Sequence, residues 1–169
     1  MAWSKRLLEL SVTFAVDQLP SWDEREINWG VENAQIAVRW WNRQPIPLEF
    51  AIKEYASMAC IGWESMDYYQ LFTVADRELE KGRLLLLLRS AMAFGGFARF
   101  DRYALCVNGG VLGGRMIHKL GHLLGASDHA VWGEHGWECD PEPDVMCRGI
   151  VSERASWRTL YEIVRAEGA

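Results

Sequence analysis

The stretch Met116-Ile-His-Lys-Leu-Gly-His-Leu-Leu-Gly-Ala-Ser-Asp-His129 brings together residues that can hold a metal ion. His118 and His122 are four residues apart, so on a helix they project from one face and can share one ion. Gly125 stands where that helix should end, because glycine adopts the left-handed conformation after a helix at little cost. Asp128 and His129 then follow, and either could supply a third ligand.

The spacing His-Lys-x-x-His-x-x-Gly-x-x-Asp resembles the signature of the metzincin zinc peptidases, H-E-x-x-H-x-x-G-x-x-H, whose last residue is sometimes aspartate. Metzincins of the matrixin and archaemetzincin type also place a methionine in a tight turn beneath the metal. Here Pro143-Asp-Val-Met146-Cys lies at a suitable distance downstream. The resemblance therefore implies a zinc metallopeptidase scaffold with Met146 in this turn.

The resemblance also implies the ligand set. His118 and His122 correspond to the first two zinc ligands, and Asp128 is the third by register with the signature. His129 would take the third place if the turn after Gly125 contained one extra residue. Zinc is accordingly the expected cofactor, and a peptide or protein is the expected substrate or ligand.

One position departs from the signature. Metzincins carry their catalytic glutamate directly after the first histidine, where this chain has Lys119. That glutamate takes a proton from the attacking water and passes it to the leaving amine, which contributes about 10²–10⁴ in rate. Lysine is already protonated at neutral pH and cannot accept this proton. We therefore expect a zinc-binding peptidase scaffold that hydrolyses peptides poorly or not at all.

Three alternatives remain open for this site. Lys119 could have a depressed pKa and act itself as a ligand or base. The domain could be a non-catalytic module that binds a peptide or protein partner. It could also be a metal-free structural domain in which the ammonium group replaces the charge of the ion.

The four cysteines fall into two groups. Cys60 and Cys106 lie far from the histidines in sequence and are expected as buried thiols, or as one disulfide in an exported or hyperthermophile protein. Cys139 and Cys147 bracket the methionine turn. They could form a disulfide that staples this turn, or a second zinc site with His135 or His129.

Composition limits the classes of partner. The chain has 169 residues, of which 50% are hydrophobic, enough for one sizeable core in a single domain. A net charge of -5 argues against a nucleic-acid or anionic-membrane partner. Glu9 and Asp17 interrupt the apolar N-terminal run, so we expect a cytoplasmic monomer, or a secreted one if a signal peptide has been removed.

The first half of the chain predicts two strands around a helix. Alternating apolar residues indicate a strand over 11–17. The capping box Ser21-Trp-Asp-Glu24 predicts the start of a helix, which prolines at 45 and 47 end. Leu48–Ile52 alternates again, and its pairing with the first strand should be parallel because a helix intervenes. The region 55–63 is expected as a loop, and 66–80 as a short helix or an irregular segment.

The middle of the chain predicts three further strands. The stretch 83–89, Arg-Leu-Leu-Leu-Leu-Leu-Arg, is either a central strand buried on both faces or part of a helix, and the flanking glycine and charges favour the strand. Phe94-Gly-Gly-Phe-Ala-Arg-Phe100 indicates a glycine-bent strand near an edge, and residues 103–107 another strand. By resemblance to the family, the stretch from Gly95 to Phe100 is the candidate edge for pairing with an extended peptide.

After His129, glycines and prolines predict a loop-rich stretch without regular backbone hydrogen bonding. Ser152 is then expected to cap a closing helix, in which Val164 belongs to the apolar face. The expected fold class is α/β (α+β): a twisted mixed sheet, two main helices, the metal-binding helix, the methionine turn and a small C-terminal helical lobe. Residues 1–125 should form the N-terminal subdomain of one 1–169 domain, and 126–169 its C-terminal lobe.

Overall fold

In the computed structural model, five strands form one mixed sheet in the order β2-β1-β3-β5-β4. The structure describes residues 4–17, 22–79, 82–89, 95–109, 112–128, 145–147 and 155–168, and the backbone alone of 130–133 and 136–139. The sheet strands are β1 (Arg6–Val16), β2 (Leu48–Ala59), β3 (Leu84–Leu88), β4 (Gly96–Arg99) and β5 (Tyr103–Val107). Strands β1, β2, β3 and β5 run parallel, and β4 pairs antiparallel with β5.

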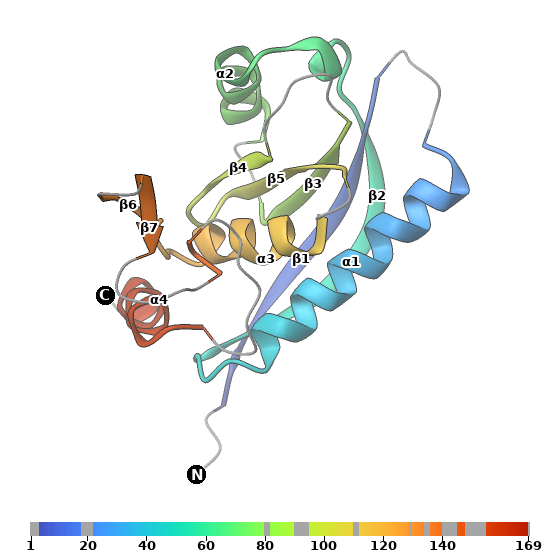
Figure 1. The fold of residues 1–169 in the computed structure, drawn as a ribbon. Coiled ribbons are helices and arrows are strands. Elements are labelled where there is room, and N and C mark those ends of the chain that lie inside the picture. The colour runs from blue at the N-terminus through green and yellow to red at the C-terminus, as the bar shows by residue number, and fades with distance from the viewer. Residues whose placement is uncertain are drawn as a thin grey trace.

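Four α-helices accompany the sheet (Figure 1). They are α1 (Glu24–Asn42), α2 (Tyr68–Glu78), α3 (Leu112–Leu123) and α4 (Trp157–Gly168), with a short 3-10 helix η1 (Trp63–Ser65) before α2. A separate hairpin contains β6 (Ala130–Gly133) and β7 (Gly136–Cys139). The predicted α/β class, the parallel pairing of the first two strands and the strand over the leucine run are confirmed. None of the helices in the described ranges is long and apolar enough to cross a membrane.

Both faces of the sheet are buried at β3. Leu85 and Leu87 of β3 point into a cluster shared with α1 and α3, whereas Leu86 and Leu88 point into a second cluster under α2. Figure 1 shows α1 and α3 lying along the same side of the strands. Burial on two faces explains why β3 is a continuous apolar run, since neither face needs polar side chains. The glycine before β3 and its flanking charges therefore identified the strand correctly.

The helix α1 begins two residues later than its predicted capping box. Asp23 is the N-cap: its carboxylate accepts from the Glu26 amide (2.8 Å), and the Glu26 side chain accepts from the Asp23 amide (3.3 Å). The prediction of Ser21 and Glu24 as the box is therefore wrong. Both quartets fit a capping pattern, and aspartate is as good an N-cap as serine.

The strand β2 continues to Ala59, so the loop predicted over 55–63 is wrong for its first five residues. The register with β1 shifts between Leu10, which opposes Ile52, and Ser11, which opposes Glu54. Lys53 is thus the extra residue of a bulge and reverses the alternation of inward and outward side chains. The alternation of apolar residues in 48–52 does not continue past Lys53, so the sequence did not indicate the rest of the strand. The short helix expected within 66–80 is present as α2.

The C-terminal part departs from the sequence prediction at three places. The hairpin β6–β7 replaces part of the expected loop. Gly133, the last residue of β6, pairs with Gly136, the first residue of β7. The helix α4 begins at Trp157, where the Ser156 hydroxyl accepts from the Thr159 amide (3.3 Å) as an N-cap does. Ser152, the predicted cap, lies outside the described residues. Val164 is 37% exposed, so its assignment to the buried face is also wrong.

Asp76 of α2 fastens the edge of the sheet. Its carboxylate accepts hydrogen bonds from both Nε (2.8 Å) and Nη2 (2.9 Å) of Arg99, from Arg102 (3.1 Å) and from the Tyr103 hydroxyl (3.2 Å). The bond from Arg99 is the main cause that lowers the pKa of Asp76 from 3.8 to about 2. This carboxylate therefore ties α2 to β4 and β5.

We expect Asp76→Asn to destabilise the protein by about 1 kcal/mol at pH 7, a value reduced for solvent screening because the side chain is partly exposed. Because the pKa of Asp76 is lower in the folded than in the unfolded state, its ionised carboxylate stabilises the fold above the unfolded-state pKa. This stabilisation is lost as the pH falls through the folded-state pKa. The difference between Asp76→Asn and the unaltered protein in urea unfolding should therefore shrink between about pH 4 and pH 2. Asp101→Asn, which breaks an exposed pair with Arg83, is the control. An Asp76→Asn effect that is constant with pH would contradict this account.

Candidate metal centre

The helix α3 presents the two histidines. Met116 and Leu120 are fully buried in the core shared with α1 and the sheet, which fixes the rotation of the helix. His118 then points toward Val145 in the turn at 145–147, and His122 toward Ala126 in the turn after the helix. Gly125 has φ +107°, and the Ala126 amide donates to Gly121 O (2.9 Å), which ends the helix in the left-handed turn expected from the sequence.

Three side-chain atoms meet at this helix end. The distance from His118 Nε2 to His122 Nε2 is 3.1 Å. Asp128 Oδ1 lies 3.1 Å from each of these nitrogens. These three residues are brought together as the sequence proposed, in an arrangement that could hold a metal ion.

Backbone carbonyls orient both imidazoles. His118 Nδ1 lies 2.6 Å from Val145 O, and His122 Nδ1 lies 2.9 Å from Ala126 O. A carbonyl oxygen only accepts, so each Nδ1 carries the proton that it donates. In the neutral ring, Nε2 then has no hydrogen and directs a lone pair at the common point.

Two lone pairs and a carboxylate oxygen that converge in this way repel one another unless a cation or a proton lies between them. The donor set therefore fits a divalent metal, for which imidazole and carboxylate are ordinary ligands. The rings are nearly perpendicular (87°), so their lone pairs do not lie in one plane. If protons occupy the centre instead of a cation, hydrogen bonds from His118 and then His122 hold the pKa of Asp128 far below its usual range.

The centre is open on one side. The side chains of His118 and His122 are 11% and 18% exposed, whereas that of Asp128 is 66% exposed. A metal held by these three groups could therefore be reached from the Asp128 side. Three protein ligands with an accessible side are typical of catalytic metal sites, since structural sites are closed by a fourth protein ligand.

Lys119 lies beside the centre. Burial lowers the pKa of its ammonium group, and the electrostatic influence of the Cys106 thiol and the Asp128 carboxylate opposes that shift. In the parts of the chain that the structure describes, Lys119 forms no hydrogen bond or ion pair. Its charge is thus only weakly compensated next to the histidines.

Met146 packs against α3 at Gly121. Met146 is fully buried, and a Cβ added at Gly121 would lie 2.3 Å from Met146 Sδ and 3.0 Å from Trp41 Cζ2. Trp41 Nε1 also donates to Ile117 O (2.9 Å). Sequence analysis did not single out Gly121 or Trp41. The signal for Gly121 was a glycine inside a helix, which costs about 1 kcal/mol relative to alanine unless close packing requires it.

The other predicted site residues are histidines and cysteines. His129 and His135 and the side chain of Cys139 lie outside the described residues. Cys147 is disulfide-bonded, so its sulfur is not available as a thiolate ligand. Cys60 and Cys106 are buried free thiols, and burial raises the pKa of both to about 12.

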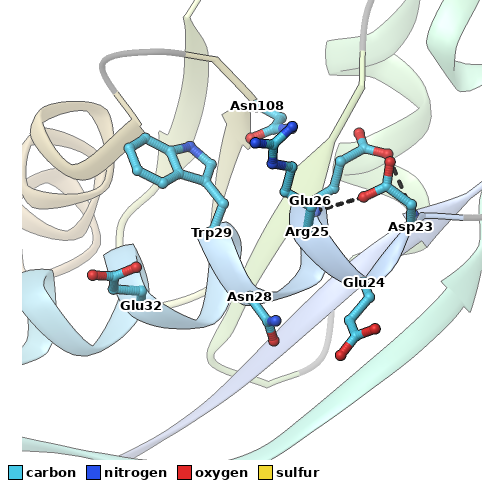
Figure 2. A pocket seen from close by; sticks show the side chains of 8 residues that line it. All are labelled: Asp23, Glu24, Arg25, Glu26, Asn28, Trp29, Glu32 and Asn108. Carbon is cyan, nitrogen blue, oxygen red and sulfur yellow. Dashed lines mark hydrogen bonds between the residues drawn. The ribbon is translucent and has the colours of Figure 1, made fainter.

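A wider cavity of about 830 Å³ lies elsewhere, along the N-terminal half of α1 (Figure 2). Two of its four carboxylates are engaged locally: those of Asp23 and Glu26 form the helix cap, and Glu26 Oε1 also lies 3.6 Å from Arg89 Nη1. Trp29 Nε1 donates to Gly109 O (3.2 Å). These contacts complete the helix start and its packing on the sheet, and the cavity does not include the metal-binding groups.

Comparison with known proteins supports the fold. No family model matches the chain, and no curated protein matches it. Among solved structures, the chain is similar to metalloproteinase-II from Bacteroides fragilis, with TM-score 0.58 and 14% identity over 98% of this chain and 54% of that one. It is also similar to a chain in the structure of a chaperone-substrate complex, with TM-score 0.55 and 11% identity over 95% of this chain and 30% of the other. This chain thus spans about half or less of each neighbour, and the likeness establishes a fold shared with a metalloproteinase.

We expect Gly121→Ala to destabilise the protein by about 1–3 kcal/mol, because the added methyl group would overlap Met146 Sδ. The displaced helix should also hold metal more weakly, since His122 is the next residue. Urea unfolding and metal titration measure the two effects. Gly168→Ala, where an added Cβ meets nothing within 4 Å, is the matched control. Equal stability of the two variants would show that Met146 does not require glycine at position 121.

Proposed function

We propose that this protein binds one zinc ion through His118, His122 and Asp128 on a metzincin-like metallopeptidase scaffold. We further propose that it hydrolyses peptides weakly or not at all because Lys119 occupies the position of the general base. Zinc, when bound, supplies a Lewis acid that polarises a peptide carbonyl and makes water more acidic.

The convergence of His118 Nε2, His122 Nε2 and Asp128 Oδ1 carries this proposal. Tetrahedral zinc with bonds of about 2.0–2.2 Å separates its ligand atoms by about 3.3–3.6 Å. The three separations here are each 3.1 Å. A small outward movement of each side chain would reach the zinc geometry, and the Nδ1 bonds already set the required tautomers. Zinc also binds imidazole and carboxylate ligands, and it has no electronic preference for a geometry other than tetrahedral.

Two further features support a metzincin-like arrangement. The chain turns at Gly125 and returns Asp128 to the histidines, as the H-x-x-x-H-x-x-G-x-x-D spacing requires. Met146 lies in a turn packed against the underside of the metal helix at Gly121. These are the places of the glycine and of the methionine turn in the family that the sequence resembles.

Lys119 accounts for the proposed loss of peptidase activity. A general base must hold an available lone pair near the reacting water. Lysine offers one only after deprotonation, and its ammonium group lies near a site that attracts a dication. The neighbouring Asp128 carboxylate, a ligand in this proposal, reduces this repulsion.

The remaining role of such a scaffold is peptide binding. The strand β4 is the end strand in the order β2-β1-β3-β5-β4 and lies against α3. An extended peptide could pair with its outer edge and pass over the metal centre. We therefore propose a peptide or protein segment as the ligand.

Metal analysis tests the first part. Purified protein should contain about one equivalent of zinc, and His118→Ala or His122→Ala should lower this to below about a tenth of an equivalent. Asp128→Asn should weaken binding less than loss of either histidine, since the amide oxygen can still coordinate. Circular dichroism of each variant checks that the fold is retained. Unaltered protein without zinc, even after incubation with the metal, would support a metal-free structural domain.

Peptidase assays with zinc-loaded protein test the second part. Lys119→Glu should raise the turnover of a denatured protein substrate about 10²-fold or more, because it restores a proton acceptor. Lys119→Gln removes the ammonium group without adding a base, and should remain inactive. If the unaltered protein were active and Lys119→Gln abolished that activity, lysine itself would be the base. No gain from Lys119→Glu would indicate a site that has lost more than one catalytic group.

A further inference from the structure

A small cavity of about 280 Å³ lies beside His122. Its walls come from four parts of the fold: β4, the turn after β4, the end of α3 with its following turn, and α4. The described residues that line it are Ala98, Phe100, His122, Gly125, Ala126 and Ala166. None of these residues carries a carboxylate, ammonium or guanidinium group, so the cavity suits an uncharged guest.

Four of the six lining residues are alanine or glycine, and Phe100 lies at the rim. Phe100 is 56% exposed, which is high for a large aromatic side chain. Gly125 lies close to both Phe100 and Ala166, since a Cβ added at Gly125 would lie 2.7 Å from Ala166 Cβ and 3.1 Å from Phe100 Cε2. Ala166 itself lines the cavity, so a larger side chain at position 166 would take up part of its volume.

The cavity lies to one side of the metal centre. A Cβ added at Gly95 would lie 3.4 Å from Arg115 Nε, and the Asp101 amide donates to Leu123 O (3.0 Å). The segment 95–101 and α3 therefore run in the same direction beside each other. The end of this segment, with Phe100, lies past the two histidines toward the C-terminal end of α3.

The side chains of β4 show which face of an added strand would meet the cavity. Ala98 packs toward the cluster that contains α3, whereas Phe97 packs into the opposite cluster under α2. In a strand paired with β4, every second side chain would likewise face the α3 side. Antiparallel pairing, the more stable kind, would place the N-terminal residues of that strand near Phe100.

We infer that this cavity binds a leucine-sized apolar side chain on the N-terminal side of the peptide group that lies at the metal. The inference rests on the proposed function, because it assumes a peptide paired with β4. Phe100 and Ala166 are then the residues that determine specificity. An apolar side chain gains contact with Phe100 and the alanine methyl groups, and a charged one would lose solvation without a partner.

Peptide hydroxamates test this inference without requiring catalysis. The hydroxamate is a metal-binding group, and a leucine or alanine is placed one or two residues before it. At one of these two positions, zinc-loaded protein should bind the leucine probe at least about tenfold more tightly than the alanine probe, as measured by calorimetry. Probes with the same residues after the metal-binding group should show no such preference.

Three variants examine the walls. Ala166→Leu should fill the cavity and reduce the leucine preference to within about twofold, whereas Ala166→Ser retains the volume and should keep it. Phe100→Ala removes an exposed side chain with little risk to folding, and should weaken binding of the leucine probe alone. Zinc content is measured for every sample.

Full zinc content with equal affinity for the leucine and alanine probes would overturn the inference and leave the zinc-binding proposal intact. A preference only for residues after the hydroxamate would also overturn it, because the guest would lie on the other side. Failure of the unaltered protein to retain zinc would overturn both proposals.

Discussion

Two hydrogen bonds to backbone carbonyls govern the chemistry of the metal centre. Val145 O and Ala126 O take the Nδ1 protons of His118 and His122 and leave both Nε2 atoms as acceptors at one point. Without those bonds the rings could rotate or change tautomer, and a hydrogen bond between them would satisfy both. With them, the uncompensated lone pairs beside the Asp128 carboxylate make a cation the natural occupant.

The sequence predicted elements whose signal is local. Two histidines one helical turn apart, a glycine after the helix and a buried leucine strand each depend on residues near one another, and each lies where expected. The errors arose where the outcome depended on a tertiary contact, or where two residues were equally suited to one role. Lys53 reverses the phase of β2 only because β1 lacks an opposing residue, and Asp23 competed with Ser21 as a cap of similar strength.

The support of the site was harder to predict than its ligands. The approach of Met146 to Gly121 and the bond from Trp41 to Ile117 join segments that are far apart in sequence, with no spacing rule to connect them. The cavity beside His122 likewise needs α4 to lie against Gly125. Such features follow from packing, which one sequence does not reveal through periodicity.

The contact between His118 and Val145 spans 27 residues. During folding, α3 can form from local interactions, but the first histidine is oriented only after that long segment has closed on the helix. The entropy of this closure must be overcome before the imidazoles are preorganised. An ion captured earlier by flexible side chains could help to close the loop, so metal uptake and folding of the C-terminal segment should be thermodynamically linked.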